Sequence, residues 1–312
     1  MMFIRDFTAL SKKDTSIAGG KGASLGEMTQ VGIPVPPGFV ILAQAFEAFE
    51  QEAKLDKKIP KLLQAVKPTN PKSLDLAAKR ISKLILSSKM SMVLTAQILA
   101  GFKKLRSAQV AVRSSATAED SSSASWAGEL ESYLNVTQKD LLASVKKCWA
   151  SLFTPRAIFY RFEKRLNRSK VSVAVVVQKM IQSEVSGIAF TVHPVSKNRR
   201  QMVIESGYGL GEAVVGGRIT PDTHVVEKRQ LRIVDKNISS QNLMIVRASK
   251  GNLEKVVPAN LRNKQKIQDK QILELARLCL QIEKHYHKPQ DIEWAYEKRK
   301  FFVVQSRPIT TL

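Results

Sequence analysis

Four polar residues with the chemistry of a phosphate site interrupt two predicted strands in "DIEWAYEKRKFFVVQSRP", residues 291–308. Asp291 and Glu293 are carboxylates, Gln305 offers an amide oxygen, and Arg307 carries a guanidinium group. Carboxylate and amide oxygens suit Mg²⁺, which proteins hold with few ligands of their own and with substrate phosphates. A guanidinium group binds phosphate through two parallel hydrogen bonds. The set therefore indicates a site for Mg²⁺ and a phosphate.

The length of the turn between the two strands decides whether these side chains meet. If the turn has three residues, Glu293 faces Gln305 and Asp291 faces Arg307, and all four lie on one side of the sheet. A turn of two residues would set Glu293 opposite Val304 and separate the cluster. We expect the three-residue turn. The alternative to a site is an exposed cross-strand ion pair between Asp291 and Arg307.

Two further cations stand beside small residues that let backbone amides approach an anion. Lys21 lies in "GGKGASLG", which we expect to open a helix, and the free N–H groups of a helix N-terminus suit a phosphate. The segment is not a P-loop, because Thr15 stands where the first glycine is required. Arg113 ends a predicted strand before a loop of small residues. The alternatives are a flexible loop around Lys21 and an ion pair from Arg113 to an acid of its own loop.

A glycine-rich turn, "IESGYGLGEAVVGG", carries Glu205 and Glu212 after another predicted strand. Its glycines lack the spacing of a dinucleotide-binding loop, since the glycine that follows Gly211 is Gly216. Contact with a ligand and a purely structural turn both remain open for this segment.

These residues require a framework of mixed strands and helices. Hydrophobic periodicity predicts helices over residues 55–105, 138–165 and 261–286, with strands between them. The strands and helices do not alternate as regular βαβ units, which favours an α+β sandwich of two lobes. We place the first lobe at residues 1–170, including the helical segment, and the second at residues 171–312.

The net charge of +23 is concentrated in two segments. Residues 54–106 carry 13 basic against 2 acidic residues, and residues 228–270 carry 11 against 3. We expect both segments to lie at the surface and to favour an acidic partner. Nucleic acid is the lesser option, because no zinc spacing or RNA-binding signature occurs there. A solvated lysine face without any partner is the alternative.

The remaining composition is that of a globular protein, with 44% apolar and 25% charged residues. Apolar runs such as Val173–Val177 are too short to span a bilayer, and the N-terminus lacks the apolar core of a secretory signal. Cys148 and Cys279 lack metal-ligand spacing and lie in apolar helical patterns, so we expect buried free thiols. We expect a cytoplasmic protein that contacts no membrane.

Taken together, these stretches resemble the N-terminal nucleotide-binding domain of the phosphoenolpyruvate synthase (pyruvate, water dikinase) family. Pyruvate phosphate dikinase and rifampin phosphotransferase share that domain. The resemblance covers nearly the whole chain and rests on the order and spacing of "GGKGASLGEM", "VPPGFVI", "AVRSSATAED", "SGIAFTVHP", "IESGYGLGEAVVGG" and "FFVVQSRPITTL". It implies an ATP-grasp fold, in which ATP lies between two α+β lobes, with a helical insertion in the first lobe.

The resemblance also implies roles for residues of this chain. The residues expected to bind the phosphates and to act in catalysis are Lys21, Arg113 and Arg307. Gln178 and Met180 belong to a hinge that meets adenine through backbone groups, and Glu205 and Asp291 complete the ATP site. The metal ligands would be Glu293 and Gln305, with Mg²⁺ as the metal.

Three features depart from the pattern of that family. Trp126 and Glu129 stand in the serine-rich lid where the family more often has Phe and Gln, and His193 stands where Asn or Asp is commoner. The third departure is the absence of any match to the family's phosphohistidine signature. The histidine carrier and the pyruvate-binding domain are therefore expected on a separate chain or on a missing part of this one.

The function that follows is ATP binding and phosphoryl transfer in a phosphoenolpyruvate synthase-like enzyme. The family reaction converts ATP, pyruvate and water to AMP, phosphoenolpyruvate and phosphate by way of the carrier histidine. An antibiotic phosphotransferase of the rifampin type and a non-catalytic nucleotide-binding module are the alternatives.

Overall fold

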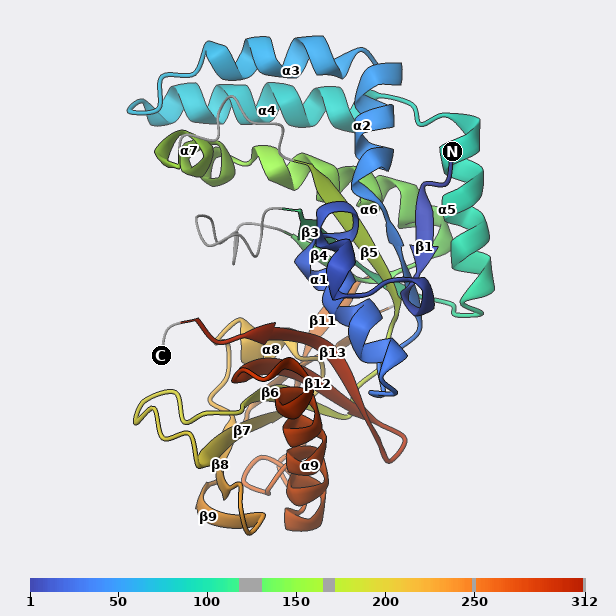
Figure 1. Cartoon of the computed structure of the whole chain (residues 1–312). Coiled ribbons are helices and arrows are strands. Elements are labelled where there is room, and N and C mark those ends of the chain that lie inside the picture. The colour runs from blue at the N-terminus through green and yellow to red at the C-terminus, as the bar shows by residue number, and fades with distance from the viewer. Residues whose placement is uncertain (118–130, 165–171, 249–250, 311–312) are drawn as a thin grey trace. The chain divides into compact units, whose positions relative to one another are not determined.

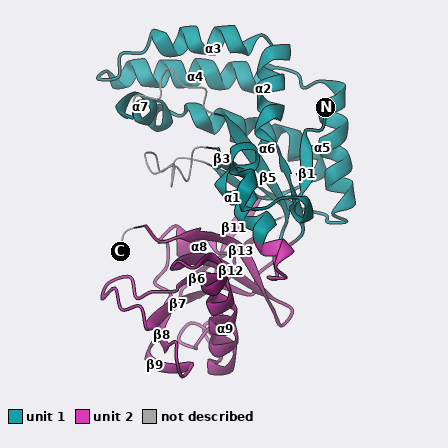
Figure 2. Ribbon diagram, viewed as in Figure 1, with its two compact units in different colours: residues 1–27, 37–180 teal, residues 28–36, 181–312 magenta. Residues whose placement is uncertain are grey.

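The computed structural model describes residues 1–117, 131–164, 172–248 and 251–310. Figures 1 and 2 show two compact units, the first of residues 1–27 and 37–180 and the second of residues 28–36 and 181–312. Each unit contains an antiparallel sheet and helices. The predicted α+β class is confirmed.

The first unit is built on a five-stranded sheet with the order β1-β2-β5-β3-β4. Its strands are β1 (Ile4–Asp6), β2 (Gly38–Ile41), β3 (Val110–Ala116), β4 (Ser132–Val136) and β5 (Val173–Lys179). β5 is apolar along most of its length because it lies in the centre of the sheet, between β2 and β3. The sequence division at residue 170 assigned β5 to the second lobe, whereas the structure pairs it within the first.

Helices cover both faces of this sheet. They are α1 (Thr15–Gln30), α2 (Ala43–Glu52), α3 (Leu55–Gln64), α4 (Pro71–Ser87), α5 (Met92–Lys104), α6 (Gln138–Ala150) and α7 (Pro155–Glu163). Short 3₁₀ helices span Phe7–Ala9, Lys12–Asp14 and Ser151–Phe153. The side chain of Asn70 accepts hydrogen bonds from the N–H groups of Lys72 and Ser73, and this cap begins α4. The helical segment predicted over 55–105 thus corresponds to α3, α4 and α5.

The main core of the first unit lies between the sheet and the layer that contains α2 to α7. Trp149 is fully buried there, with the rings of Phe46 and Phe49 at 5.4 and 4.9 Å. Alternate residues of β5 (Val173, Val175 and Val177) belong to this core. The residues between them face α1 on the other side.

The second unit is built on a six-stranded sheet with the order β13-β12-β6-β7-β8-β9. Its strands are β6 (Val185–Phe190), β7 (Gln201–Tyr208), β8 (Asp222–Glu227), β9 (Arg232–Asn237), β12 (Gln290–Glu297) and β13 (Lys300–Pro308). A separate hairpin is formed by β10 (Leu243–Arg247) and β11 (Asn252–Val256), and the helices are α8 (Glu212–Val215) and α9 (Asp269–Tyr286).

Helix α9 covers one face of the second sheet. The predicted inward residues Ile272, Leu275, Cys279 and Ile282 are all buried. The prediction that this helix begins at residue 261 is wrong, because Gln268 and Gln271 cap each other reciprocally and fix the start at Asp269. The face that α9 leaves uncovered is the one that carries the predicted site.

Both cysteines are buried free thiols, as predicted. Burial raises the pKa of Cys148, and it raises the pKa of Cys279 to about 12. Neither thiol is therefore a thiolate near neutral pH.

Within the described part of the chain, no single helix has the length and apolar character needed to cross a membrane. The pair α4 and α5, bent by 82° at the break between them, meets that test by length and composition only when taken together.

Candidate functional site

Three of the predicted acids lie on the face of the second sheet opposite α9. Glu293 pairs with Gln305 on one side and with Ile188 on the other, and Ile188 pairs with Glu205. Residues that pair directly across antiparallel strands project to the same face. Gln305, Glu293, Ile188 and Glu205 therefore form one row across β13, β12, β6 and β7.

The adjacent row of the same face carries the ion pair that the sequence predicted. Arg307 pairs with Asp291, which pairs in turn with Phe190. The Arg307 Nε atom donates to Asp291 Oδ2 at 2.9 Å, and Nη2 forms an ion pair with the same oxygen at 2.8 Å. The Arg307 side chain remains half exposed, so part of its guanidinium group faces solvent.

The turn that joins β12 and β13 differs from the predicted one. Glu297 pairs with Lys300, so the turn consists of Lys298 and Arg299 and not of three residues through Lys300. Both turn residues have positive φ, 49° and 63°. A two-residue turn with two positive φ angles matches the right-handed twist of an antiparallel pair, and tertiary context here imposes it on two residues that disfavour it.

A β-bulge nevertheless restores the predicted pairing. Trp294 pairs with Val303, while Glu293 pairs with Gln305, so Val304 is the extra residue of β13. Without the bulge, Glu293 would lie opposite Val304. The short turn and the bulge each displace the register by one residue, and the two displacements cancel.

The carboxylates of this face interact electrostatically. Burial raises the pKa of Asp291, Arg307 lowers it, and the charge of Glu293 raises it again. Burial also raises the pKa of Glu205, and the charge of Asp291 adds to that effect. The face thus holds several half-buried acids with one guanidinium group beside them, which is an environment for a bound cation.

The donor set on this face fits a magnesium ion that shares its ligands with a substrate. Glu293 supplies carboxylate oxygens and Gln305, 8% exposed, supplies an amide oxygen. Mg²⁺ prefers oxygen ligands and is often held by one or two carboxylates together with phosphates. Among the described residues, no three His, Cys, Asp or Glu side chains gather closely enough to hold a metal by themselves.

In the first unit, Lys21 follows a sharp break inside α1. Gly19 has φ 68° and ψ 169°, a conformation that is essentially restricted to glycine, and helical geometry resumes after it. A Cβ atom on Gly19 would lie 2.4 Å from the backbone oxygen of Ser115. Lys21 therefore stands in the first turn of a new helical segment, where backbone N–H groups and the helix dipole favour an anion.

Ser115 holds this break against β3. Its Oγ atom donates to the carbonyl of Ala18 at 3.0 Å and accepts from the N–H of Gly22 at 3.2 Å. The sequence-based reasoning missed this role. A serine two residues after Arg113 was visible in "VRSS", but its partner lies 97 positions away in the chain.

Arg113 and Gln178 lie on the same face of the first sheet as α1. Arg113 and Ser115 are two residues apart on β3, and Arg113 pairs with Val176 of β5. Gln178 is two residues beyond Val176 and is buried. Met180 follows the end of β5 and donates its N–H to the carbonyl of Gln109 at 3.2 Å. The predicted residues of the first unit thus come from α1, β3 and the end of β5.

The glycine-rich turn after β7 has a structural role in its second half. Glu212 begins α8 and accepts a hydrogen bond from Asn252 of β11. Gly209, with φ 88°, lies so close to Ile245 that a Cβ atom would be 2.4 Å from its carbonyl oxygen. Of the two acids predicted in this turn, Glu205 is the one on the site face.

His193 replaces the side-chain cap that an Asn or Asp would provide. Its Nδ1 atom accepts hydrogen bonds from the N–H groups of Val195 and Ser196 at 3.3 and 3.2 Å. These are the contacts by which Asn and Asp stabilise turns. Trp126 and Glu129, the other departures from the family pattern, lie outside the described residues.

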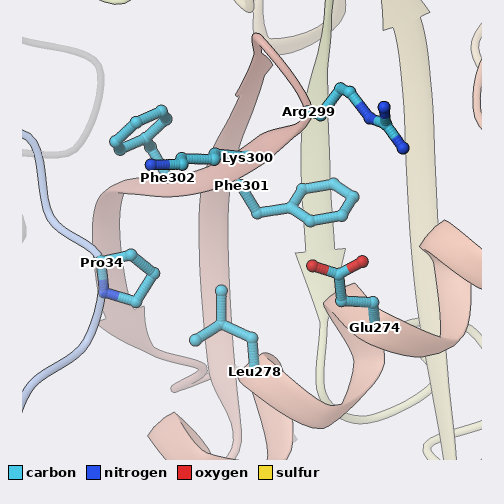
Figure 3. Close-up of a pocket in the computed structure, with 7 residues that line it drawn as sticks. All are labelled: Pro34, Glu274, Leu278, Arg299, Lys300, Phe301 and Phe302. Atoms are coloured by element: carbon cyan, nitrogen blue, oxygen red, sulfur yellow. The ribbon is translucent and has the colours of Figure 1, made fainter.

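A pocket of about 310 Å³ lies in the second unit at the end of the β12–β13 hairpin (Figure 3). Its lining residues are Pro34, Glu274, Leu278, Arg299, Lys300, Phe301 and Phe302. None of them belongs to the predicted site, so this pocket is separate from the acidic rows.

Comparisons of this chain with known proteins identify the same family of nucleotide-binding domains. Residues 15–312 match the family described as pyruvate phosphate dikinase, AMP/ATP-binding domain. A probable phosphoenolpyruvate synthase of Methanocaldococcus jannaschii is 48% identical, over 100% of this chain and 27% of its own length. The phosphoenolpyruvate synthase of Pyrococcus furiosus is 42% identical, over 99% of this chain and 44% of its own length. The rifampicin phosphotransferase of Bacillus subtilis is 39% identical, over 97% of this chain and 35% of its own length.

The chain therefore spans between about a quarter and under half of the length of these curated relatives. A solved structure from Pyrococcus horikoshii covers 75% of this chain and 89% of its own, with 12% identity and a TM-score of 0.34. A likeness of that size carries no argument about the fold.

Proposed function

Since this chain belongs to the pyruvate phosphate dikinase AMP/ATP-binding domain family, we propose that it is the ATP-binding part of a phosphoenolpyruvate synthase-like phosphotransferase. The observation that carries the proposal is the pairing of Glu293 with Gln305 beside the Asp291–Arg307 pair on one sheet face. Oxygen ligands for a cation and a guanidinium group for a phosphate are adjacent there. We propose an ATP-grasp fold in which the two units bind one nucleotide.

Each predicted residue has a role in this proposal. Lys21 and Arg113 bind the triphosphate, Lys21 with the N–H groups that follow the Gly19 break. Gln178 and Met180 meet the adenine base at the end of β5. Glu293 and Gln305 would hold Mg²⁺, which would neutralise phosphate charge when bound.

The remaining three residues act where phosphoryl transfer takes place. The guanidinium group of Arg307 binds the transferred phosphates, and Asp291 orients that group through a hydrogen bond and an ion pair. Glu205 faces the same row and adds negative charge on the cation side of the site. Phosphoryl transfer depends mainly on positioning and on electrostatic stabilisation, which these groups supply.

The proposed reaction is that of the relatives named phosphoenolpyruvate synthase. ATP passes phosphoryl groups to a histidine carrier domain, AMP and phosphate are released, and pyruvate receives the remaining phosphoryl group. The carrier and the pyruvate-binding domain would lie on a separate chain or on a further part of this one. We propose that the enzyme works in the cytoplasm.

One observation favours rifampicin as an alternative acceptor to pyruvate. The chain is 39% identical to a rifampicin phosphotransferase over nearly its whole length. The residues proposed to bind ATP would serve either acceptor. Assaying the complete native enzyme, with its own carrier and acceptor-binding domains, on pyruvate and on rifampicin, and measuring which one is phosphorylated, distinguishes the two.

Calorimetry with ATP and Mg²⁺ tests the proposed site directly. The wild-type chain should bind ATP more tightly with Mg²⁺ than without it. Glu293→Gln should weaken the Mg²⁺-dependent binding by at least roughly tenfold, because it removes a carboxylate ligand and even the loss of a residue that supports a ligand has an effect of this size. The matched control, Glu274→Gln, removes the same charge from an exposed site on α9 and should leave binding unchanged. Equal losses in both variants, or no binding by a folded wild-type chain, would reject the assignment.

A further inference from the structure

The outward face of α4 carries a stripe of three lysines and two leucines. Lys72, Leu76, Lys79, Lys83 and Leu86 follow one another at intervals of four, three, four and three residues. This spacing places all five on one side of a helix. The opposite side of α4 packs into the core through Leu74, Ala77, Ala78, Ile81 and Ile85. The stripe is therefore a second, solvent-facing seam on a helix whose first seam is already buried.

The leucines of the stripe are exposed to solvent. Leu76 is 51% and Leu86 is 38% exposed. Single exposed leucines are ordinary, but here two lie on one seam, about 15 Å apart along the helix axis, with Lys79 and Lys83 between them. Covering these apolar side chains with a partner would remove them from water, which is favourable.

The cations of this face also lack partners of opposite charge. Lys72, Lys79 and Lys83 are exposed, with Arg80 beside them, and none forms an ion pair within the described residues. Asp75 is the single acid at the border of the stripe. Helix α3, which packs beside α4 (Figure 1), adds the exposed Lys57, Lys58 and Lys61. The field of this surface is therefore strongly positive.

We propose that the outward face of α4 docks an amphipathic helix of a partner protein, with an apolar seam and acidic flanks. The heptad-like spacing fits a straight, rod-shaped partner, since a helix presents its own apolar residues at the same intervals. The leucines would pack against that seam, and the lysines would face carboxylates at its flanks.

The leucines and the composition of both helices disfavour a nucleic acid. α3 and α4 contain no aromatic side chain on which a base could stack. A phosphate backbone would engage the lysines but would leave Leu76 and Leu86 uncovered. An acidic amphipathic helix satisfies both components of the stripe.

Fluorescence anisotropy with a designed probe tests the proposal. The probe is a labelled helical peptide with leucines along one seam and glutamates on both flanks, and a short single-stranded oligothymidine serves as the competing polyanion. The full-length chain should bind the peptide more tightly than the oligothymidine, and binding should weaken as salt increases. Charge reversal of the stripe, Lys72→Glu with Lys79→Glu and Lys83→Glu, should weaken peptide binding by about tenfold or more.

Two matched variants separate the components of the surface. Lys255→Glu with Lys264→Glu and Lys270→Glu makes the same change in net charge on exposed residues of the second unit and should leave peptide binding nearly intact. Leu76→Ser with Leu86→Ser should weaken peptide binding while it leaves oligothymidine binding unchanged. Circular dichroism and ATP affinity should match the wild type in every variant.

Three outcomes would overturn the proposal. They are the absence of peptide binding by the wild type, equal losses in the two charge-reversal variants, and tighter binding of the oligothymidine than of the peptide. ATP binding is measured separately, so that a failure of this surface does not bear on the proposed nucleotide site.

Discussion

The proposed site residues of the two units are positioned by different physical means. In the first unit, Lys21 depends on a backbone break at Gly19 that is held against β3 by Ser115. In the second unit, Glu293 depends on strand register, which a turn and a bulge set together. Close contact with β3 fixes the break at Gly19. The number of residues between the turn and the bulge fixes the register of Glu293.

This difference predicts different sensitivities to mutation. A break held by buried contacts should fail when a single atom is added or removed, because close-packed backbone cannot move aside. A register held by a hairpin should tolerate most single substitutions and should respond to changes in turn preference. The charges of the two groups are also opposite, since the first offers cations and the second offers mainly acids.

The largest effect is expected at the break. Gly19→Ala forces on alanine a backbone conformation that is essentially restricted to glycine, at a cost of roughly 1–3 kcal/mol. It also places a methyl group 2.4 Å from the Ser115 carbonyl oxygen, and overpacking of this kind adds roughly 1–3 kcal/mol. We therefore expect a large loss of stability in urea unfolding and a loss of ATP binding.

Gly32→Ala is the control for Gly19→Ala. Gly32 has a similar φ of 76°, but no atom lies within 4 Å of a Cβ atom built on it. It should therefore lose only the conformational part of the free energy, roughly 1–2 kcal/mol. Equal losses at both glycines would mean that contact with β3 does not hold the break.

The second effect concerns the hydroxyl that holds the break. Ser115→Ala removes both hydrogen bonds of a fully buried Oγ atom and leaves the carbonyl of Ala18 without that donor. We expect a loss of roughly 1–3 kcal/mol in the free energy of unfolding, together with weaker ATP binding.

Ser206→Ala provides the matched comparison in the second unit. Its Oγ atom is equally buried but has no hydrogen-bond partner among the described residues. Removing that hydroxyl should be neutral or stabilising, because an unsatisfied polar group is taken out of the core. If both serines cost the same, the contrast between the two units would lose its basis.

The sequence could predict the paired site of the second unit better than the break in the first. The period of two in β12 and β13 was enough to place the two acids on one face, since that period is a property of every strand. The turn was predicted with one residue too many and the bulge at Val304 was missed. Valine suits either face of a strand, so the bulge left no pattern in the sequence.

The break at Gly19 shows the opposite limit. The glycine pair before Lys21 was visible, but the reason for it is a contact with a strand almost a hundred residues later. The start of α9 was predicted too early because apolar residues continue upstream of Gln268, whereas the reciprocal cap that fixes the start depends on two glutamine side chains. Apolar patterns indicate elements and faces, whereas side-chain caps decide where a helix begins and contacts with a distant strand decide where it breaks.

The third effect tests the register of the hairpin by strengthening it. Lys298 and Arg299 both have positive φ, which asparagine and glycine accept at lower cost in a two-residue turn. Lys298→Asn with Arg299→Gly should therefore stabilise the chain by roughly 1 kcal/mol in urea unfolding. ATP binding should be unchanged, because neither residue belongs to the proposed site.

Lys300→Gly tests where the turn ends. Lys300 is a strand residue that pairs with Glu297, so glycine there should destabilise the chain by roughly 0.5–1 kcal/mol. In a three-residue turn, Lys300 would be a turn residue and glycine would be tolerated. A stabilising Lys300→Gly together with a neutral double variant would favour the longer turn.

The smallest effect concerns Glu205 in the second unit, whose charged form is disfavoured by burial and by the charge of Asp291. Burial and the charge of Asp291 raise the pKa of Glu205 in the folded state. A carboxyl with a raised pKa binds protons more tightly when folded than when unfolded, so its contribution to stability falls as pH rises through that window. Glu205→Gln should therefore raise the melting temperature slightly near neutral pH, and the gain should disappear at acidic pH, where Glu205 is protonated in both states. Glu274→Gln, which removes an exposed carboxylate from the same unit, should show no such gain. If Glu205→Gln instead lowered the melting temperature at neutral pH, Glu205 would be stabilised as an anion, and the acidic rows would have to be regarded as a stable ion network that needs no bound cation.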